Sequence, residues 1–220
     1  MEINKIYNMD CLEGIRKIPD CSIASIITDP PYFLGLTSNG QKGSFSDLQI
    51  CTPFYKELFG EFKRVLKKDG CIYFFTDWRA YAFYYPIFDN VIGARNMLVW
   101  NKGSGAGSYY TFAHELILYY GREISGGGAN VITGIPGFAA GAKKEDGEKI
   151  HPAQKPTKLI RKLIRDSTKE GELVLDCFMG SGTTAISCIR EHRNYIGFEI
   201  CENNYEVCMK RIGREKSQEA

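Results

Sequence analysis

The stretch LVLDCFMGSGTT, residues 173–184, joins an apolar run that ends in an acid to a glycine-containing turn and the start of a helix. Gly180 and Gly182 allow positive φ and a close approach between the backbone and a ligand. A strand, a glycine turn and a helix in this order are typical of α/β sheets, in which ligands bind beyond the carboxyl ends of the strands. The stretch therefore predicts an α/β fold with a ligand site at this turn.

A second acid ends the next apolar run. Residues 195–199 (YIGFE) form a predicted strand that ends at Glu199, where a carboxylate can accept both hydroxyls of a ribose. This combination favours a nucleoside cofactor over an ordinary tight turn. NAD is compatible with the spacing, because the dinucleotide pattern tolerates Ala185 at its third glycine position. Asp176 favours S-adenosylmethionine, because a carboxylate repels a pyrophosphate and attracts the ammonium and sulfonium charges.

The rest of the chain alternates between strand-like and helix-like patterns. Strands are predicted over 23–28, 71–76, 96–100, 115–120, 173–177 and 195–199. Helices are predicted over 53–67, 77–89, 157–168, 183–192 and 202–213. Residues 121–150 lose periodicity and are predicted to form a glycine-rich loop. This alternation predicts a mostly parallel sheet with helices on both faces.

The sequence SIASIITDPPYFLGL, residues 22–36, places a stiff polar corner after one of these strands. Asp29 closes the strand at the same edge as the glycine turn, and Pro30 and Pro31 hold the following chain extended. Such a corner can present the Asp29 carboxylate, the Pro30 carbonyl oxygen and the Tyr32 ring toward one point. Two acceptors and a flat ring match an exocyclic amino group on a base, which offers two N–H donors and a π-face. The alternative is a strand exit with a solvated acid and a packed tyrosine.

DPPY at 29–32 and FMGSGTT at 178–184 together resemble the amino-methyltransferases of DNA, and their order resembles the β group of that family. VWNKGSG at 99–105, HELIL at 114–118 and HPAQKP at 151–156 agree with this resemblance. It implies a Rossmann-like, S-adenosylmethionine-dependent methyltransferase fold of the α/β class, with permuted motif order and a mostly parallel seven-stranded sheet.

The resemblance also implies how the chain is organised. A single domain, 1–220, is expected to contain a catalytic half (1–121), a shortened target-recognition loop (122–150) and a cofactor-binding half (151–220). The implied catalytic residues are Asp29, Pro30, Pro31 and Tyr32. The implied cofactor-binding residues are Asp176, Phe178, Gly180, Ser181, Gly182, Thr183, Thr184 and Glu199, with His151 and Lys155 from the HPAQKP segment.

The implied activity is methyl transfer from S-adenosylmethionine to the N6 amino group of an adenine that is flipped out of the DNA duplex. Adenine is favoured because DPPY is typical of the adenine enzymes, whereas cytosine-N4 enzymes more often have serine first. The alternatives are a cytosine-N4 methyltransferase, a non-catalytic DNA-binding relative, an NAD-dependent oxidoreductase, and a methyltransferase acting on RNA or on a protein glutamine.

Composition adds few constraints. The 220 residues are 44% hydrophobic, enough for one well-filled core, and the net charge of +2 does not by itself predict a polyanion partner. None of the eight cysteines pairs at zinc-ligand spacing, so they are predicted to be small, reduced, structural residues, and no metal is expected. A basic, apolar leader is absent from the N-terminal sequence, which favours a cytoplasmic protein. The expected partners are double-stranded DNA and a second copy of the chain, without a membrane, in DNA methylation of the restriction-modification type.

Overall fold

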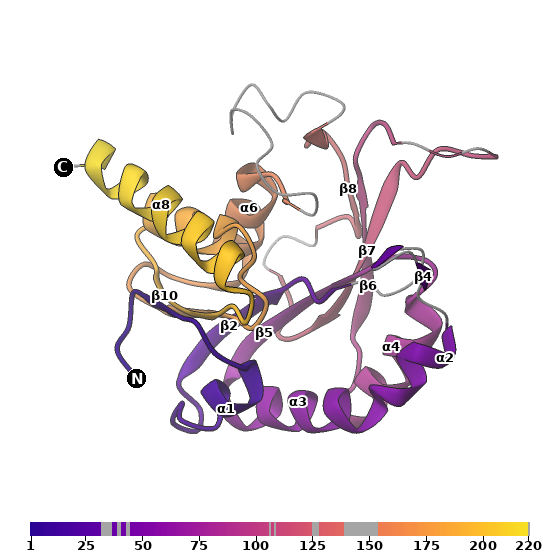
Figure 1. The fold of residues 1–220 in the computed structure, drawn as a ribbon, viewed down its shortest axis with the longest axis horizontal. Helices are drawn as coiled ribbons and strands as arrows, with labels where there is room; N and C mark the ends of the chain where they lie inside the picture. The colour runs from indigo at the N-terminus through magenta and orange to yellow at the C-terminus, as the bar shows by residue number, and fades with distance from the viewer. Residues whose placement is uncertain are drawn as a thin grey trace.

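One twisted sheet forms the centre of the computed structural model, which describes residues 1–31, 37–38, 41–42, 45–105, 107, 109–124, 128–138 and 154–219 (Figure 1). The predicted site residues Tyr32 and His151 lie outside these ranges. In spatial order the strands of the sheet are β1 (Lys5–Tyr7), β10 (Asn194–Phe198), β9 (Leu173–Asp176), β2 (Ile23–Thr28), β5 (Leu66–Thr76), β7 (His114–Tyr120), β6 (Asn96–Asn101) and β8 (Val131–Ile132). A separate hairpin pairs β3 (Thr37–Ser38) with β4 (Gln41–Lys42).

The sheet is mostly parallel, as predicted. Strands β1, β10, β9, β2 and β5 pair in parallel, whereas β7 runs antiparallel to both β5 and β6. The described sheet has eight strands instead of the expected seven. The additional strand is β8, a two-residue edge strand that pairs in parallel with β6. It lies inside the stretch 121–150, which was predicted to be only loop.

Helices cover both faces of the sheet, as Figure 1 shows. One layer contains α1 (Cys11–Ile15), α3 (Thr52–Val65) and α4 (Tyr81–Val91), and the other contains α6 (Thr157–Ser167), α7 (Thr183–Arg190) and α8 (Glu202–Glu219). The short helix α2 (Phe45–Ile50) precedes α3. Successive strand residues point to opposite faces, so Phe74 packs with the first layer and Phe75 with the second. This two-sided burial explains why β2 is apolar without alternation.

Several boundaries differ from the sequence predictions, among them the end of α8, which extends to Glu219 instead of residue 213. The helix predicted over 77–89 begins only at Tyr81, because the Asp77 side chain accepts hydrogen bonds from the backbone N–H groups of Arg79 and Ala80 and holds a turn there. Strand β5 begins at Leu66, where the backbone becomes extended and ends α3. The short elements β1 and α1 were not predicted, because three to five residues carry too little periodicity.

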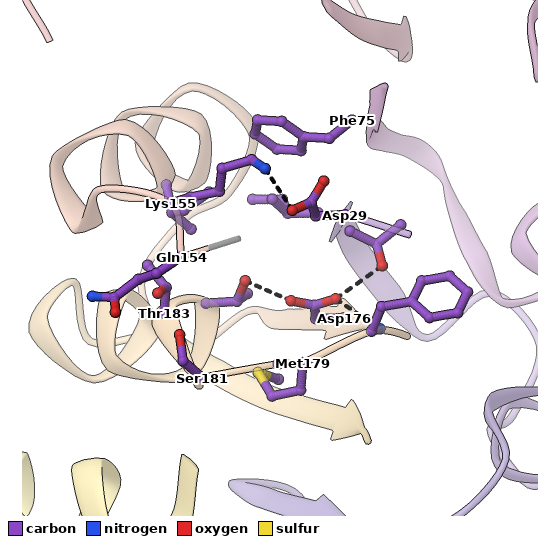
Figure 2. A pocket seen from close by; sticks show the side chains of 14 residues that line it. Asp29, Phe75, Gln154, Lys155, Asp176, Met179, Ser181 and Thr183 are labelled. Carbon is purple, nitrogen blue, oxygen red and sulfur yellow. Dashed lines mark hydrogen bonds and ion pairs between the residues drawn. The ribbon is translucent and has the colours of Figure 1, made fainter. Parts of the chain in front are cut away.

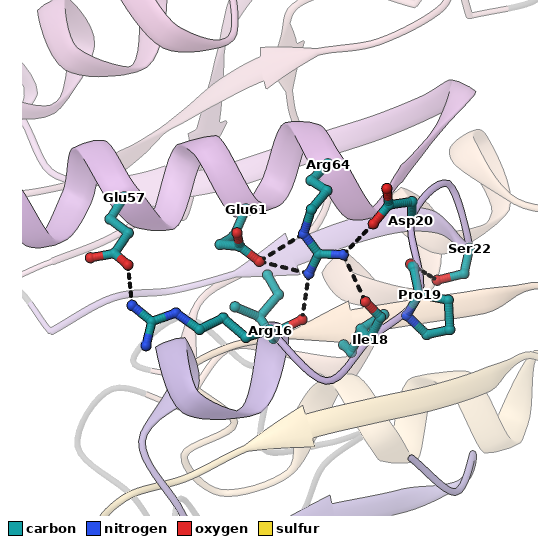
Figure 3. Close-up of polar contacts among 9 residues, drawn as sticks. Arg16, Ile18, Pro19, Asp20, Ser22, Glu57, Glu61 and Arg64 are labelled. Atoms are coloured by element: carbon teal, nitrogen blue, oxygen red, sulfur yellow. Dashed lines mark hydrogen bonds and ion pairs between the residues drawn. The ribbon is translucent and has the colours of Figure 1, made fainter.

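The partly buried Arg64 connects the chain before β2 to helix α3 (Figure 3). The Arg64 guanidinium donates to the carbonyl oxygens of Ile15 (2.9 Å) and Ile18 (2.8 Å), and to the carboxylates of Asp20 (2.6 Å) and Glu61 (2.6 Å). Ile15 and Ile18 are themselves buried. Arg64 therefore satisfies backbone acceptors in the segment that leads into β2.

Replacing Arg64 with methionine should lower the free energy of unfolding by about 1–3 kcal/mol, because the buried Ile18 carbonyl oxygen loses its donor and the Ile15 oxygen keeps only the Ile18 N–H. Urea unfolding measures the change. The matched control is Arg16→Met, which removes an exposed ion pair with Glu57 on the same helix and should leave the transition midpoint in place (Figure 3). An equal destabilisation by both variants would contradict the assigned role of the backbone contacts.

None of the helices in the described ranges is both long and apolar enough to span a membrane. All eight cysteines fall within those ranges and are free thiols; Cys11, Cys71, Cys177, Cys188 and Cys208 are buried.

Candidate active site

Three acids meet at the carboxyl edge of the parallel strands. Strand β2 pairs with β9, and β9 pairs with β10, so the residues that end these strands are neighbours in space. Asp29 follows β2, Asp176 is the last residue of β9, and Glu199 follows β10. Segments that are far apart in the chain therefore place three carboxylates at one edge, where α/β sheets bind ligands.

The Asp176 carboxylate accepts three hydrogen bonds from neutral donors. Its Oδ1 accepts from the Thr28 hydroxyl (2.8 Å) and the Phe178 backbone N–H (3.0 Å), and its Oδ2 accepts from the Thr184 hydroxyl (2.7 Å). Burial raises the pKa of Asp176 to about 6, although the three donors act in the opposite direction. A buried carboxylate without a cation among these partners is suited to a positively charged ligand.

The glycine turn after β9 is fixed by two side chains. Gly180 (φ 54°) and Gly182 (φ 84°) both have left-handed backbone conformations. Glu199 Oε2 accepts from the Gly180 N–H at 2.8 Å, and Arg211 of α8 donates to the Ser181 carbonyl oxygen at 2.7 Å. A Cβ at Gly182 would lie 2.6 Å from Cys208 Sγ, so this glycine allows α8 to pack against the turn.

Asp29 lies at the other side of the same edge, in an ion pair. Its Oδ2 accepts from Lys155 Nζ at 2.5 Å, and Figure 2 shows the lysine pointing toward this carboxylate beside the Phe75 ring. After Asp29, Pro30 is buried and Pro31 is exposed. Burial opposes the charged form of Lys155, but the carboxylates of Asp29 and Glu115 outweigh it and raise the pKa of the lysine above its usual value.

Two neighbouring cavities lie along this edge. The first, of about 70 Å³, is lined by Asp29, Asp176 and the glycine turn (Figure 2). Its lining includes Asp29, Phe75, Gln154, Lys155, Asp176, Phe178, Met179, Gly180, Ser181, Thr183 and Thr184. The second, of about 270 Å³, is more apolar and is lined by Met9, Asp10, Cys11, Pro31, Cys51, Phe54, Tyr55, Cys177, Phe178, Glu199 and Ile200. Phe178 lines both, so the cavities suit a long ligand with a cationic end and a flat apolar end.

The structure thus brings most of the predicted residues to these two cavities. Eight of the predicted side chains or backbone positions line the first, namely Asp29, Lys155, Asp176, Phe178, Gly180, Ser181, Thr183 and Thr184. Pro31 and Glu199 line the second, whereas Pro30 and Gly182 line neither.

Several contributing residues were missed from the sequence. The N-terminal residues Met9, Asp10 and Cys11 line the apolar cavity, Arg211 holds the turn, and Thr28 donates to Asp176. Asp10 also caps α1 by accepting from the Leu12 N–H, and an acid before a short apolar stretch was the one available signal. Thr28 and Arg211 carried no local signal, because their partners are distant in the sequence.

Comparisons with known proteins identify the family. The model of the DNA methylases of the N6/N4 class matches residues 23–124 and 134–210. The type II methyltransferase M.HinfI of Haemophilus influenzae is 30% identical over 249 residues, covering 96% of this chain and 68% of that protein. M1.MboII of Moraxella bovis is 29% identical, covering 94% of both chains.

Solved structures share the fold. The M1.HpyAVI complex with SAM has a TM-score of 0.69 at 21% identity, covering 94% of this chain and 98% of that one. The cytosine-N4-specific PvuII DNA methyltransferase has a TM-score of 0.69 at 21% identity, covering 97% and 91%. The predicted family and the Rossmann-like fold are confirmed: this chain belongs to the DNA methylases of the N6/N4 class.

Proposed function

We propose that this protein transfers a methyl group from S-adenosylmethionine to the N6 amino group of an adenine in double-stranded DNA. The observation that carries the proposal is the convergence of Asp29 and Asp176 on one cavity beside a glycine turn. One carboxylate serves the cationic cofactor and the other serves the acceptor base. We also propose that the enzyme acts in the cytoplasm, where it would meet genomic DNA. A second copy of the chain is the other proposed partner.

The donor chemistry of the two cavities fits S-adenosylmethionine, which supplies an electrophilic methyl group on a sulfonium. Asp176 would attract its positive charges, and Ser181 and Thr183, which line the same cavity at the turn and at the first residue of α7, would hold its methionine end. Glu199, which lines the second cavity, would accept the ribose hydroxyls, and Met9, Cys11 and Ile200 would provide apolar surface for the adenine ring.

Asp29 acts on the target base. Its carboxylate accepts a hydrogen bond from the amino group, orients the nitrogen toward the methyl group and favours the positive charge that develops there. The Pro30 carbonyl oxygen is proposed as the second acceptor and the Tyr32 ring as the stacking surface. Because a paired base cannot reach this recessed edge, the adenine must flip out of the duplex. The methylated nitrogen is acidic, so its proton passes to Asp29 or water without a strong base.

Replacing Asp29 with alanine should reduce methyl transfer by at least about a thousandfold, because the amino group loses its acceptor. Tritiated methyl transfer to DNA measures turnover, and calorimetry should find the affinity for S-adenosylmethionine within about threefold of the parent protein. Asp29→Asn is the companion variant, which keeps an acceptor oxygen but not the charge, and should retain intermediate activity. Robust turnover by Asp29→Ala would refute the assigned role.

The affinity for S-adenosylmethionine should depend on pH through Asp176. The pKa of this carboxyl is near 6, so above that pH it is ionised and binds the cationic cofactor, whereas below it the acid is neutral. The dissociation constant should therefore be constant above about pH 7 and rise about tenfold per pH unit below pH 6. Calorimetry across this range measures the profile.

Two variants control this experiment. Asp176→Asn should bind weakly with no pH dependence between pH 5 and 7. Asp166→Asn removes a carboxylate that pairs with Lys162 on α6, outside both cavities, and should retain the parent profile. A pH-dependent profile that persists in Asp176→Asn would show that another group is responsible.

The acceptor base is decided by product analysis. DNA methylated with labelled S-adenosylmethionine should release N6-methyladenosine on digestion to nucleosides, because the DPPY corner is typical of adenine enzymes. Mass spectrometry separates this product from N4-methylcytosine, which would support the cytosine alternative. The Asp29→Ala protein is the matched control and should release neither. An active parent protein that yields only N4-methylcytosine would overturn the adenine assignment.

A further inference from the structure

Glu115 reaches the catalytic edge through the one reversed strand of the described sheet. Strand β7 is antiparallel to β5, and their register places Leu116 opposite Thr76, the last residue of β5. The start of β7 therefore lies at the same edge as the ends of β2 and β9. Glu115 lines neither of the two cavities, so it contacts the proposed ligands from neither of them.

Four charged side chains form a continuous row from this strand to Asp29. Lys155 Nζ lies 2.5 Å from Asp29 Oδ2 and 3.0 Å from Glu115 Oε2, and Lys102 Nζ lies 3.2 Å from Glu115 Oε1. The exposed fractions of the side chains are 18% for Asp29, 8% for Lys155, 17% for Glu115 and 19% for Lys102. The row is thus shielded from solvent along its length, where charges interact strongly.

The alternating charges in this row affect how well Asp29 can act as an acceptor. A lysine cation beside Asp29 weakens that carboxylate as an acceptor and opposes the positive charge that methylation produces on the amino nitrogen. A second carboxylate on the same ammonium reduces both effects. It also holds Lys155 between two anions, which fixes the plane of the Asp29 carboxylate through the contact to Oδ2.

We propose that Glu115 is a positioning residue for methyl transfer, which acts on Asp29 through Lys155. It holds the ammonium in place and keeps the group of Asp29, Lys155 and Glu115 at one net negative charge where the cationic nitrogen forms. Lys102 balances Glu115 from the outer side. This inference rests on the proposed catalytic role of Asp29.

The ionic state of Glu115 is consistent with this role. Burial acts to raise the pKa of Glu115, but the cations of Lys155 and Lys102 outweigh it and hold the pKa below the ordinary value. Glu115 is therefore ionised throughout the working pH range. Among the described residues, Asp176 of β9 and Tyr84 of α4 also interact electrostatically with Asp29.

The test is Glu115→Gln, which keeps shape and one acceptor oxygen but removes the charge. Its kcat, measured well below the melting transition, should fall about 10–100-fold, with the affinities for S-adenosylmethionine and DNA within error of the parent. The melting temperature should also fall, because Lys155 and Lys102 lose a shared counter-charge. With S-adenosylmethionine saturating at every pH, so that cofactor binding through Asp176 does not limit turnover, the acid limb of the kcat profile should move to lower pH, because losing a neighbouring anion favours ionised Asp29. A structural defect would not produce this shift.

Lys102→Gln gives the opposite sign. It removes a cation from the row, so the acid limb should move to higher pH, and this variant also decides the question if Glu115→Gln does not fold. Glu172→Gln is the matched control, since Glu172 pairs with Lys67 at 2.9 Å away from both cavities and should leave kcat and its pH profile unchanged. In a Lys155→Met background, Glu115→Gln should have no further effect on kcat.

The two proposals fail differently. If Asp29→Ala is inactive but Glu115→Gln keeps the parent kcat and pH profile, the positioning role is overturned and the proposed function stands. The positioning role is also overturned if kcat falls in parallel with cofactor affinity and without a shift of the acid limb, or if Lys102→Gln moves the acid limb in the same direction as Glu115→Gln. If Asp29→Ala remains active, the proposed function fails first.

Discussion

The parallel pairing of β2 with β9 is the constraint on which the site depends. These strands come from opposite halves of the chain, and their register sets Ser25 against Val174 and Ile26 against Leu175. The next residues must then lie at one edge, where the Thr28 hydroxyl donates to Asp176 across the two strands. Once this pairing forms, the Asp29 and Asp176 carboxylates must lie at one edge, because both stand at the carboxyl ends of neighbouring strands of the same sheet.

The edge contains two buried carboxylates that are stabilised in different ways. Asp176 is surrounded by neutral donors, so burial dominates and its pKa rises toward 6. Asp29 instead contacts a buried ammonium, which Glu115 shares. The buried Asp176 carboxylate would be stabilised by a cation, such as a sulfonium cofactor. The ion pair with Lys155 instead holds the Asp29 carboxylate in a defined orientation. Two carboxyl groups that line one cavity are therefore suited to different partners.

The sequence predicted the regular elements well where their patterns were long. The boundaries of β2 and the start of α7 agree with the predictions, because an unbroken apolar run and a glycine turn are strong local signals. The predictions were wrong where local hydrogen bonds decided the boundary, as at Asp77 before α4, and where an element was very short, as for β1 and β8. Side-chain capping and edge pairing are weakly encoded in periodicity.

The sequence alone determined the α/β class, the family, and the acids Asp29 and Asp176 at the carboxyl ends of two strands. Each of these depends on residues that are neighbours in the chain. Only the tertiary structure decided which charges surround those acids. Lys155 lies 126 positions from Asp29, and Glu115 reaches the same edge only because β7 runs antiparallel to β5. The physical reason is that an ion pair depends on distance in space and burial, and neither quantity is written in local sequence spacing.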